Sequence, residues 1–173
     1  MGVDPSLTST GLCLPCGETH ALSNKLTGWE HISYILQEIE QKLIYDEPTH
    51  ICMEGYAFSR GQVGRVFDLG ELGGCMKLLF LSWGVPIILV PATSLKLYAA
   101  GKGNAKKEIV MKEIKRRWGR SFVSSDRADA FALQQFGLDF LRGATESPGE
   151  VRALGKATVI EPPEGLQSFA KFG

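Results

Sequence analysis

Hydrophobic and polar positions repeat with two different periods along the chain, and together they predict an α/β fold. Apolar positions at helical spacing follow Thr27-Gly28-Trp29-Glu30, which matches a capping box, so a helix is predicted over residues 28–45. Further helices are predicted over 65–83, 91–100, 105–118 and 126–141. Strand-like runs occupy 3–4, 10–14, 19–22, 49–54 and 86–90. This order predicts a mixed five-stranded sheet flanked by helices.

The length of 173 residues fits one compact domain, which the pattern places at residues 1–142. Beyond Gly143 the periodicity dissolves into prolines and scattered charges, so residues 143–173 are predicted to form a flexible C-terminal tail. The helix over 65–83 carries three glycines in its middle, each of which costs about 1 kcal/mol relative to Ala. Such a cost is typical of a helix approached closely by another backbone, here that of a partner subunit.

Charge is distributed unevenly, although Lys and Arg balance Asp and Glu over the whole chain. Between Lys96 and Arg120 stand nine basic residues and only two acids, so this segment carries a net charge of +7 and the remainder −7. A neutral total can therefore hide one face that binds a polyanion.

The four cysteines, together with the start of the chain, indicate the cytoplasm. No secretory leader or lipidation signal precedes the cysteines, and the longest apolar stretch, 75–90, is interrupted by a lysine, a glycine and a proline. Cys13-Leu14-Pro15-Cys16 has no second Cys-x-x-Cys motif to pair with. The cysteines are therefore better explained as small core residues than as redox or zinc-binding groups.

Carboxylates stand where functional groups gather in open sheets. Asp4 ends the first strand, Glu54 ends the strand over 49–54, and Asp126 and Asp129 are three residues apart on a helix. Each has a structural alternative: Asp126 as an N-cap, Asp129 as a first-turn acid and Glu54 as a polar strand end. Taken together, the four acids favour a site for a hard cation such as Mg²⁺, and two such ions can support hydrolysis of a phosphodiester.

The arrangement resembles RuvC-type Holliday junction resolvases of the RNase H-like superfamily over about residues 1–142. The resemblance rests on Gly2-Val3-Asp4-Pro5-Ser6-Leu7-Thr8-Ser9-Thr10-Gly11, on Glu54 with Gly70-Glu71-Leu72-Gly73-Gly74 downstream, on Pro91-Ala92-Thr93-Ser94-Leu95-Lys96, and on Asp126-Arg127-Ala128-Asp129-Ala130. It implies an RNase H-like fold and a homodimeric, Mg²⁺-dependent endonuclease of DNA recombination and repair, from a bacterium or a phage. Such an enzyme nicks two symmetric strands of a four-way junction.

The resemblance also implies roles for individual residues. The metal-binding acids fall on Asp4, Glu54, Asp126 and Asp129, with two Mg²⁺ ions per site and Mn²⁺ as an alternative ion. In the mechanism expected here, Asp4 bridges both ions, Glu54 and Asp129 hold one each, and Asp126 completes or orients the shell. The phosphate-contacting lysines fall on Lys96 and on Lys107 or Lys106. An aromatic residue at the crossover corresponds to Tyr56 or Phe58, which flank the expected position.

The basic segment predicts a DNA surface without the resemblance. Lys106 and Lys107 are expected in the first turn of their helix, where the helix dipole disfavours lysine unless an external anion binds. A solvated lysine-rich face is the simpler alternative. A second patch, able to follow a junction arm, comprises Lys115, Arg116, Arg117 and Arg120.

Three other functions compete. The turn after Asp4 also resembles the phosphate loop of actin-like and sugar-kinase ATPases, but those proteins need two such domains around the nucleotide. A nuclease of the same fold could act instead on flaps, forks or RNA–DNA hybrids, although the glycine-rich helix favours a dimer and therefore a two-fold substrate. A catalytically inactive DNA-binding module is disfavoured while all four acids are present.

Overall fold

The computed structural model describes residues 1–55, 63–145 and 147–165, and it contains a mixed sheet with strand order β3-β2-β1-β4-β5-β6. The strands are β1 (Gly2–Asp4), β2 (Thr10–Cys13), β3 (Thr19–Leu22), β4 (Ile51–Glu54), β5 (Ile87–Val90) and β6 (Thr158–Ile160). The central strands β1, β4 and β5 are parallel, whereas β2 pairs antiparallel with β1 and β3, and β6 pairs antiparallel with β5.

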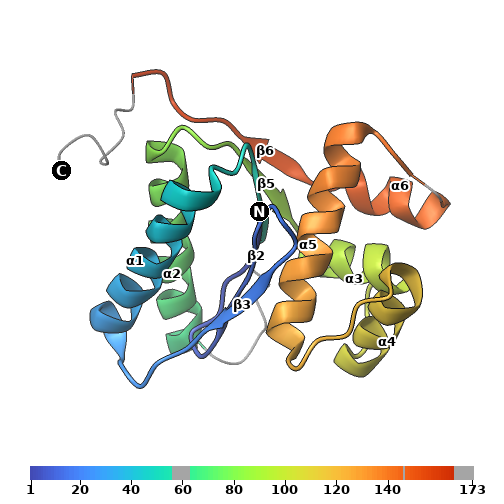
Figure 1. Ribbon diagram of the computed structural model, residues 1–173, viewed down its shortest axis with the longest axis horizontal. Coiled ribbons are helices and arrows are strands. Elements are labelled where there is room, and N and C mark those ends of the chain that lie inside the picture. The colour runs from blue at the N-terminus through green and yellow to red at the C-terminus, as the bar shows by residue number, and fades with distance from the viewer. Residues whose placement is uncertain (56–62, 146, 166–173) are drawn as a thin grey trace.

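Helices cover both faces of this sheet (Figure 1). They are α1 (Gly28–Asp46), α2 (Val63–Ser82), α3 (Ala92–Ala100), α4 (Lys107–Trp118), α5 (Ser125–Arg142) and α6 (Pro148–Leu154). Helices α1 and α2 lie on one face, and α5 lies on the other with α3, α4 and α6 beside it. Two apolar clusters form the core, one on each face of the sheet. Within the described ranges, no helix has the length and apolar composition needed to cross a membrane.

Two glycines let α5 lie directly on the sheet. A Cβ atom built on Gly2 of β1 would stand 2.0 Å from the carbonyl oxygen of Ala130, and one on Gly11 of β2 would stand 2.1 Å from that of Asp126. Both distances are shorter than atoms tolerate, so only glycine permits this approach. Because Gly11 pairs with Asp4 across the β1–β2 ladder, the first turn of α5 is placed against the end of β1.

Each predicted strand and helix over residues 1–142 is present within a few residues of its expected bounds, but the sheet has six strands instead of five. The extra strand, β6, comes from the segment that was predicted to be a flexible tail. In that segment the sequence pattern did not predict α6, residues 148–154, or β6, residues 158–160. Both elements are too short to produce a readable period: α6 buries Ala153 and Leu154 against α3, and β6 adds to the free edge of β5.

Two predicted helix starts also differ. Thr27 stands at the N-cap of α1, but its side chain makes no capping hydrogen bond, so the predicted capping box does not form. Helix α4 begins at Lys107 with Lys106 as N-cap, two residues later than the predicted start at residue 105. Caps depend on local backbone angles that side-chain pattern alone does not fix. The shift leaves Lys107 as the first helical residue of α4.

Candidate active site

Asp4 and Glu54 end two adjacent parallel strands at the same edge of the sheet. The β1–β4 register pairs Gly2 with Cys52 and Val3 with Met53, so the next pair of positions is Asp4 and Glu54. Side chains alternate along a strand. Val3 and Met53 pack in the cluster under α1 and α2, whereas Cys52 packs in the cluster under α5. Asp4 and Glu54 therefore belong to the α5 face.

Hydrogen bonds of a hydroxyl group stabilise the turn after Asp4. The Oγ1 atom of fully buried Thr10 donates to the carbonyl of Ser6 at 3.1 Å and accepts from the amide of Ser6 at 3.3 Å. Since Pro5 cannot continue a ladder as a donor, β1 ends at Asp4 and the chain reverses into β2. The carboxylate consequently stands at a fixed point of the sheet edge.

Helix α5 brings the other two acids to this edge. Ser124 is its N-cap, with a side chain that accepts a hydrogen bond from the amide of Arg127 at 3.4 Å. Asp126 is therefore not the N-cap, which removes the structural alternative considered for it. Asp126 and Asp129 lie one turn apart in the segment of α5 that rests on Gly11.

The four acids lie near enough to one another to interact electrostatically. The pKa of Asp4 is raised well above its usual value, first by burial and then by Glu54, Asp129 and Asp126. Burial and the negative charge of Asp129 raise the pKa of Glu54 to about 7, and burial together with Asp126 raises that of Asp129 to about 6. Among the described residues, Asp4, Glu54 and Asp129 make no hydrogen bond or ion pair that would offset this repulsion. The cluster is short of positive charge.

Two of the predicted lysines lie close enough to act on this cluster. Lys107, at the start of α4, lowers the pKa of Asp4, Glu54 and Asp129, and Lys96 of α3 does so for Glu54 and Asp129. Both cations reduce the shifts but do not abolish them. Both lysines were predicted to contact phosphate, and the structure places them beside the carboxylates, where a bound phosphate would lie.

Ser125 was not singled out in the sequence. Its hydroxyl accepts a hydrogen bond from Nζ of Lys107 at 3.2 Å and donates to Oδ1 of Asp126 at 3.3 Å. This bridge orients a lysine and a carboxylate of the same cluster. The only signal in the sequence was a hydroxyl residue directly before Asp126, which is too common to be informative.

The carboxylate oxygens of the four acids suit a hard cation, although they do not form a complete coordination shell. Within residues 1–55, 63–145 and 147–165, no three Asp, Glu, His or Cys side chains are gathered around a single point as metal ligands. Mg²⁺ does not require such a cage, since it keeps several waters and uses one or two carboxylates together with phosphate oxygens. Unpaired carboxylates with raised pKa values are the groups that a divalent cation stabilises in the ionised form.

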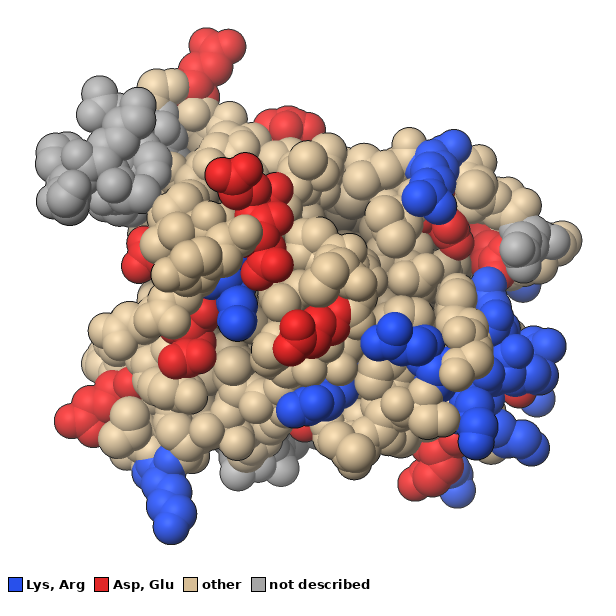
Figure 2. All heavy atoms as spheres, in the orientation of Figure 1, with Lys and Arg blue, Asp and Glu red and all other residues tan. Residues whose placement is uncertain are grey.

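The other basic residues predicted to contact DNA differ in exposure and in their partners within the protein. Lys and Arg side chains gather over α3 and α4, at the right of the view in Figure 2. Lys106 and Lys115 are exposed, and Arg116 is exposed but paired with Glu113 at 2.7 Å. Arg120 donates to the carbonyl of Gly17 at 2.9 Å.

Arg117 is not brought to this surface. Its guanidinium is largely buried and bonds to the carboxylate of Glu150 and the carbonyl of Tyr98. We therefore omit Arg117 from the DNA-contacting set. Tyr56 and Phe58, the two aromatic candidates, lie outside the described residues.

The strand order and the helices around the sheet define the class of fold. A mixed sheet flanked by helices, with acids at the ends of β1 and β4 and on the helix that crosses them, is an RNase H-like α/β fold. No family model matches the chain.

The particular relatives are bacterial. The chain is 27% identical over 159 residues to the crossover junction endodeoxyribonuclease RuvC of Chlorobium chlorochromatii, covering 86% of this chain and 82% of that protein. It is also 27% identical over 146 residues to the protein of the same name from Paenarthrobacter aurescens, covering 77% of each. The solved structure of T. thermophilus RuvC in complex with Holliday junction substrate matches 92% of this chain and 97% of that one, with a TM-score of 0.66 and 22% identity. The resemblance to RuvC-type resolvases seen in the sequence is confirmed.

Proposed function

We propose that this chain is a structure-selective endonuclease that cuts four-way DNA junctions by metal-dependent hydrolysis of phosphodiesters. The observation that carries the proposal is the cluster of Asp4, Glu54, Asp126 and Asp129, whose mutual repulsion is only partly offset by Lys96 and Lys107. Such a cluster suits a site that receives divalent cations and a phosphate together. The names of the curated relatives support the junction as substrate.

The residues have separable tasks in this proposal. Asp4, Glu54, Asp126 and Asp129 would hold Mg²⁺, or Mn²⁺ in its place. When bound, the metal supplies a Lewis acid beside the scissile phosphate and lowers the pKa of a water nucleophile. Lys96 and Lys107 bind phosphate oxygens and balance negative charge, and Ser125 orients Lys107 relative to Asp126.

Substrate choice tests this proposal. In Mg²⁺, the protein should cut a labelled four-way junction at least about tenfold faster than a duplex, a flap or an RNA–DNA hybrid of the same sequence. Comparable or faster cutting of the hybrid or flap would support a nuclease activity but reject the four-way junction as its preferred substrate. Nucleotide binding without cleavage of any of the four would reject both.

Lys107→Ala should weaken binding of a four-way junction and lower the slope of log K against log salt by about one unit, because one phosphate contact is lost. The same change should move the cleavage profile to higher pH, since Lys107 lowers the pKa of three carboxylates. Binding is measured by titration at several salt concentrations. Lys25→Ala, an exposed lysine before α1, is the matched control. An unchanged slope in Lys107→Ala would remove this contact from the account.

We also propose that the chain acts as a homodimer through α2. The helix presents an exposed stripe that includes Phe67, Gly74 and Leu78, with Phe67 and Leu78 68% and 54% exposed. A Cβ atom on Gly74 would meet no other element of the described residues within 4 Å, so packing within that part of the protomer gives no reason for this glycine. Close approach of a second α2 would explain a glycine at this position, and a two-fold dimer matches a junction with two symmetric strands.

Gly74→Arg should shift the protein from dimer to monomer in sedimentation experiments, because the long side chain blocks close approach of two helices. Gln41→Arg, on the exposed face of α1, adds the same side chain to a different helix and should leave the dimer intact. A dimer of unchanged stability in Gly74→Arg would place the interface elsewhere.

A further inference from the structure

Three helices on the α5 face meet at one buried ion pair. Arg117 of α4 donates to the carboxylate of Glu150 in α6 and to the backbone carbonyl of Tyr98 in α3. The side chains are only 17% and 8% exposed, and the guanidinium also lies over the rings of Tyr98 and Trp118, 5.1 Å and 4.3 Å from their centroids. One cation therefore joins α3, α4 and α6.

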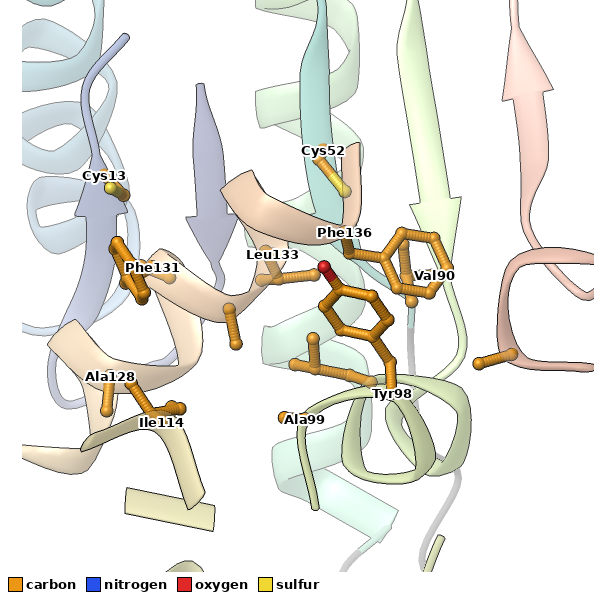
Figure 3. Packing of buried hydrophobic residues seen from close by; sticks show 14 of the residues in the cluster. Cys13, Cys52, Val90, Tyr98, Ala99, Ile114, Ala128, Phe131, Leu133 and Phe136 are labelled. Atoms are coloured by element: carbon orange, nitrogen blue, oxygen red, sulfur yellow. The ribbon is translucent and has the colours of Figure 1, made fainter. Parts of the chain in front are cut away.

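A second polar contact extends this junction to α5. The hydroxyl of Tyr98, a side chain only 1% exposed, donates to Oδ2 of Asp139 at 2.6 Å. Its ring packs edge-on against Phe136 at 5.1 Å, and both side chains lie in the apolar layer between α3 and α5 (Figure 3). Burial raises the pKa of Tyr98, so the hydroxyl keeps its proton and remains a donor.

Helix α6 holds Glu150 in a defined orientation. The amide of Ser147 donates to Oε2 of Glu150 at 3.0 Å, and the amide of Glu150 donates to Oγ of Ser147 at 3.3 Å, which is a complete capping box. The other carboxylate oxygen receives Arg117. The local start of α6 thus fixes the acid that pairs with α4.

The elements joined in this way carry the charged groups of the candidate active site. Lys96 stands two residues before Tyr98 on α3, and Lys107 stands ten residues, or about 15 Å, before Arg117 on α4. Asp129 lies ten residues before Asp139 on α5. The contacts therefore anchor the two lysine-bearing helices against the helix that bears two of the carboxylates. A small rotation of α4 about its anchored end would displace Lys107, and a displacement of about 1 Å at a reacting centre can lower a rate by about 100-fold.

We infer that Glu150 is a positioning residue of the proposed nuclease: α6, in the segment beyond residue 142, sets the position of Lys96 and Lys107 relative to the carboxylates. This inference rests on the proposed function for its kinetic consequence, but not for its structural one. Removing the charge of Glu150 leaves a buried guanidinium without its countercharge, which loosens the contact between α6 and α4.

Glu150→Gln tests the inference, and Glu113→Gln is its matched control, because Glu113 pairs with Arg116 on the surface of the same helix. Glu150→Gln should reduce cleavage of the junction at least about tenfold, whereas Glu113→Gln should change it less than twofold. In a double-mutant cycle, Lys107→Ala and Glu150→Gln should be strongly non-additive, because both act through Lys107. Additive effects would overturn the positioning role.

A measurement that needs no activity separates this inference from the proposed function. Amide hydrogen exchange at the start of α4, residues 107–111, should accelerate in Glu150→Gln and stay unchanged in Glu113→Gln. Ser147→Ala, which removes the cap and retains the ion pair, should give a smaller change in the same direction. Exchange that accelerates only within α6 in these variants would overturn the inference. If the wild-type protein cuts no junction, the proposed function fails, and the exchange result still decides whether α6 positions α4.

Discussion

Asp4→Asn should lower Mg²⁺-dependent cleavage by about 10³-fold or more while it preserves binding of the four-way junction. Asp4 interacts with all of the other three acids, since its pKa is raised first by burial and then by each of them. Asn has nearly the same shape but carries no charge for a divalent cation, so the rate should fall and the fold should remain. Rates are measured in single turnover, and binding is measured in Ca²⁺ or EDTA.

The same substitution should stabilise the metal-free protein at neutral pH. Burial and the three other acids disfavour the ionised carboxylate at position 4, which makes no compensating hydrogen bond among the described residues, so a neutral amide removes this cost. A higher melting temperature with lost activity would match the account. Asp46→Asn, at the end of α1, controls for the loss of one negative charge. An Asp4→Asn protein with wild-type activity would exclude Asp4 from the site.

In EDTA, the folded protein should become less stable as the pH rises from 4.5 to 7. Glu54 and Asp129 have folded pKa values of about 7 and 6, above their usual values of 4.5 and 3.8, and the pKa of Asp4 is also raised. In this window the folded state binds more protons than the unfolded state, so the free energy of unfolding falls with pH. The loss should be on the order of 2 kcal/mol, or about 4–8 °C in melting temperature.

Mg²⁺ should reverse this loss at pH 7, because a cation stabilises the ionised carboxylates in the folded state only. Thermal unfolding with EDTA or Mg²⁺ at both pH values gives the comparison. The range stops at pH 7 because the buried Met1 amino group, whose pKa is lowered, acts in the opposite sense near pH 8. Glu54→Gln should flatten the pH dependence in EDTA. Stability that rises with pH in EDTA, or no response to Mg²⁺, would contradict the coupling of these acids.

The sequence predicts where the four acids lie in the fold, because strand ends and helical spacing limit their possible positions. Asp4 and Glu54 each end an apolar strand, and parallel neighbours bring such ends to one edge. The close approach of α5 depends on Gly2 and Gly11, whose role appears only once the helix is placed on the sheet. The convergence of Asp126 and Asp129 with the other acids is thus a result of tertiary packing.

The sequence predicts a residue's role less well where the same residue type can serve at a binding surface or in a buried ion pair. Arg117 lies in a basic run and was expected at the DNA surface, but it is the member of that run that turns inward to meet Glu150. The partner acid comes from a segment without visible periodicity, so the ion pair could not be predicted. Likewise, Ser147 and Glu150 form the capping box that Thr27 and Glu30 only resemble.

The most direct test of the central claim is a strand-by-strand map of the cuts in an end-labelled four-way junction. With Mg²⁺, the wild-type protein should make paired nicks at symmetric positions in two opposing strands, because the proposed dimer would carry two carboxylate clusters. EDTA or Asp129→Asn should abolish the nicks while junction binding persists. Full activity of Asp129→Asn, or cuts distributed equally over junction and duplex, would contradict the account.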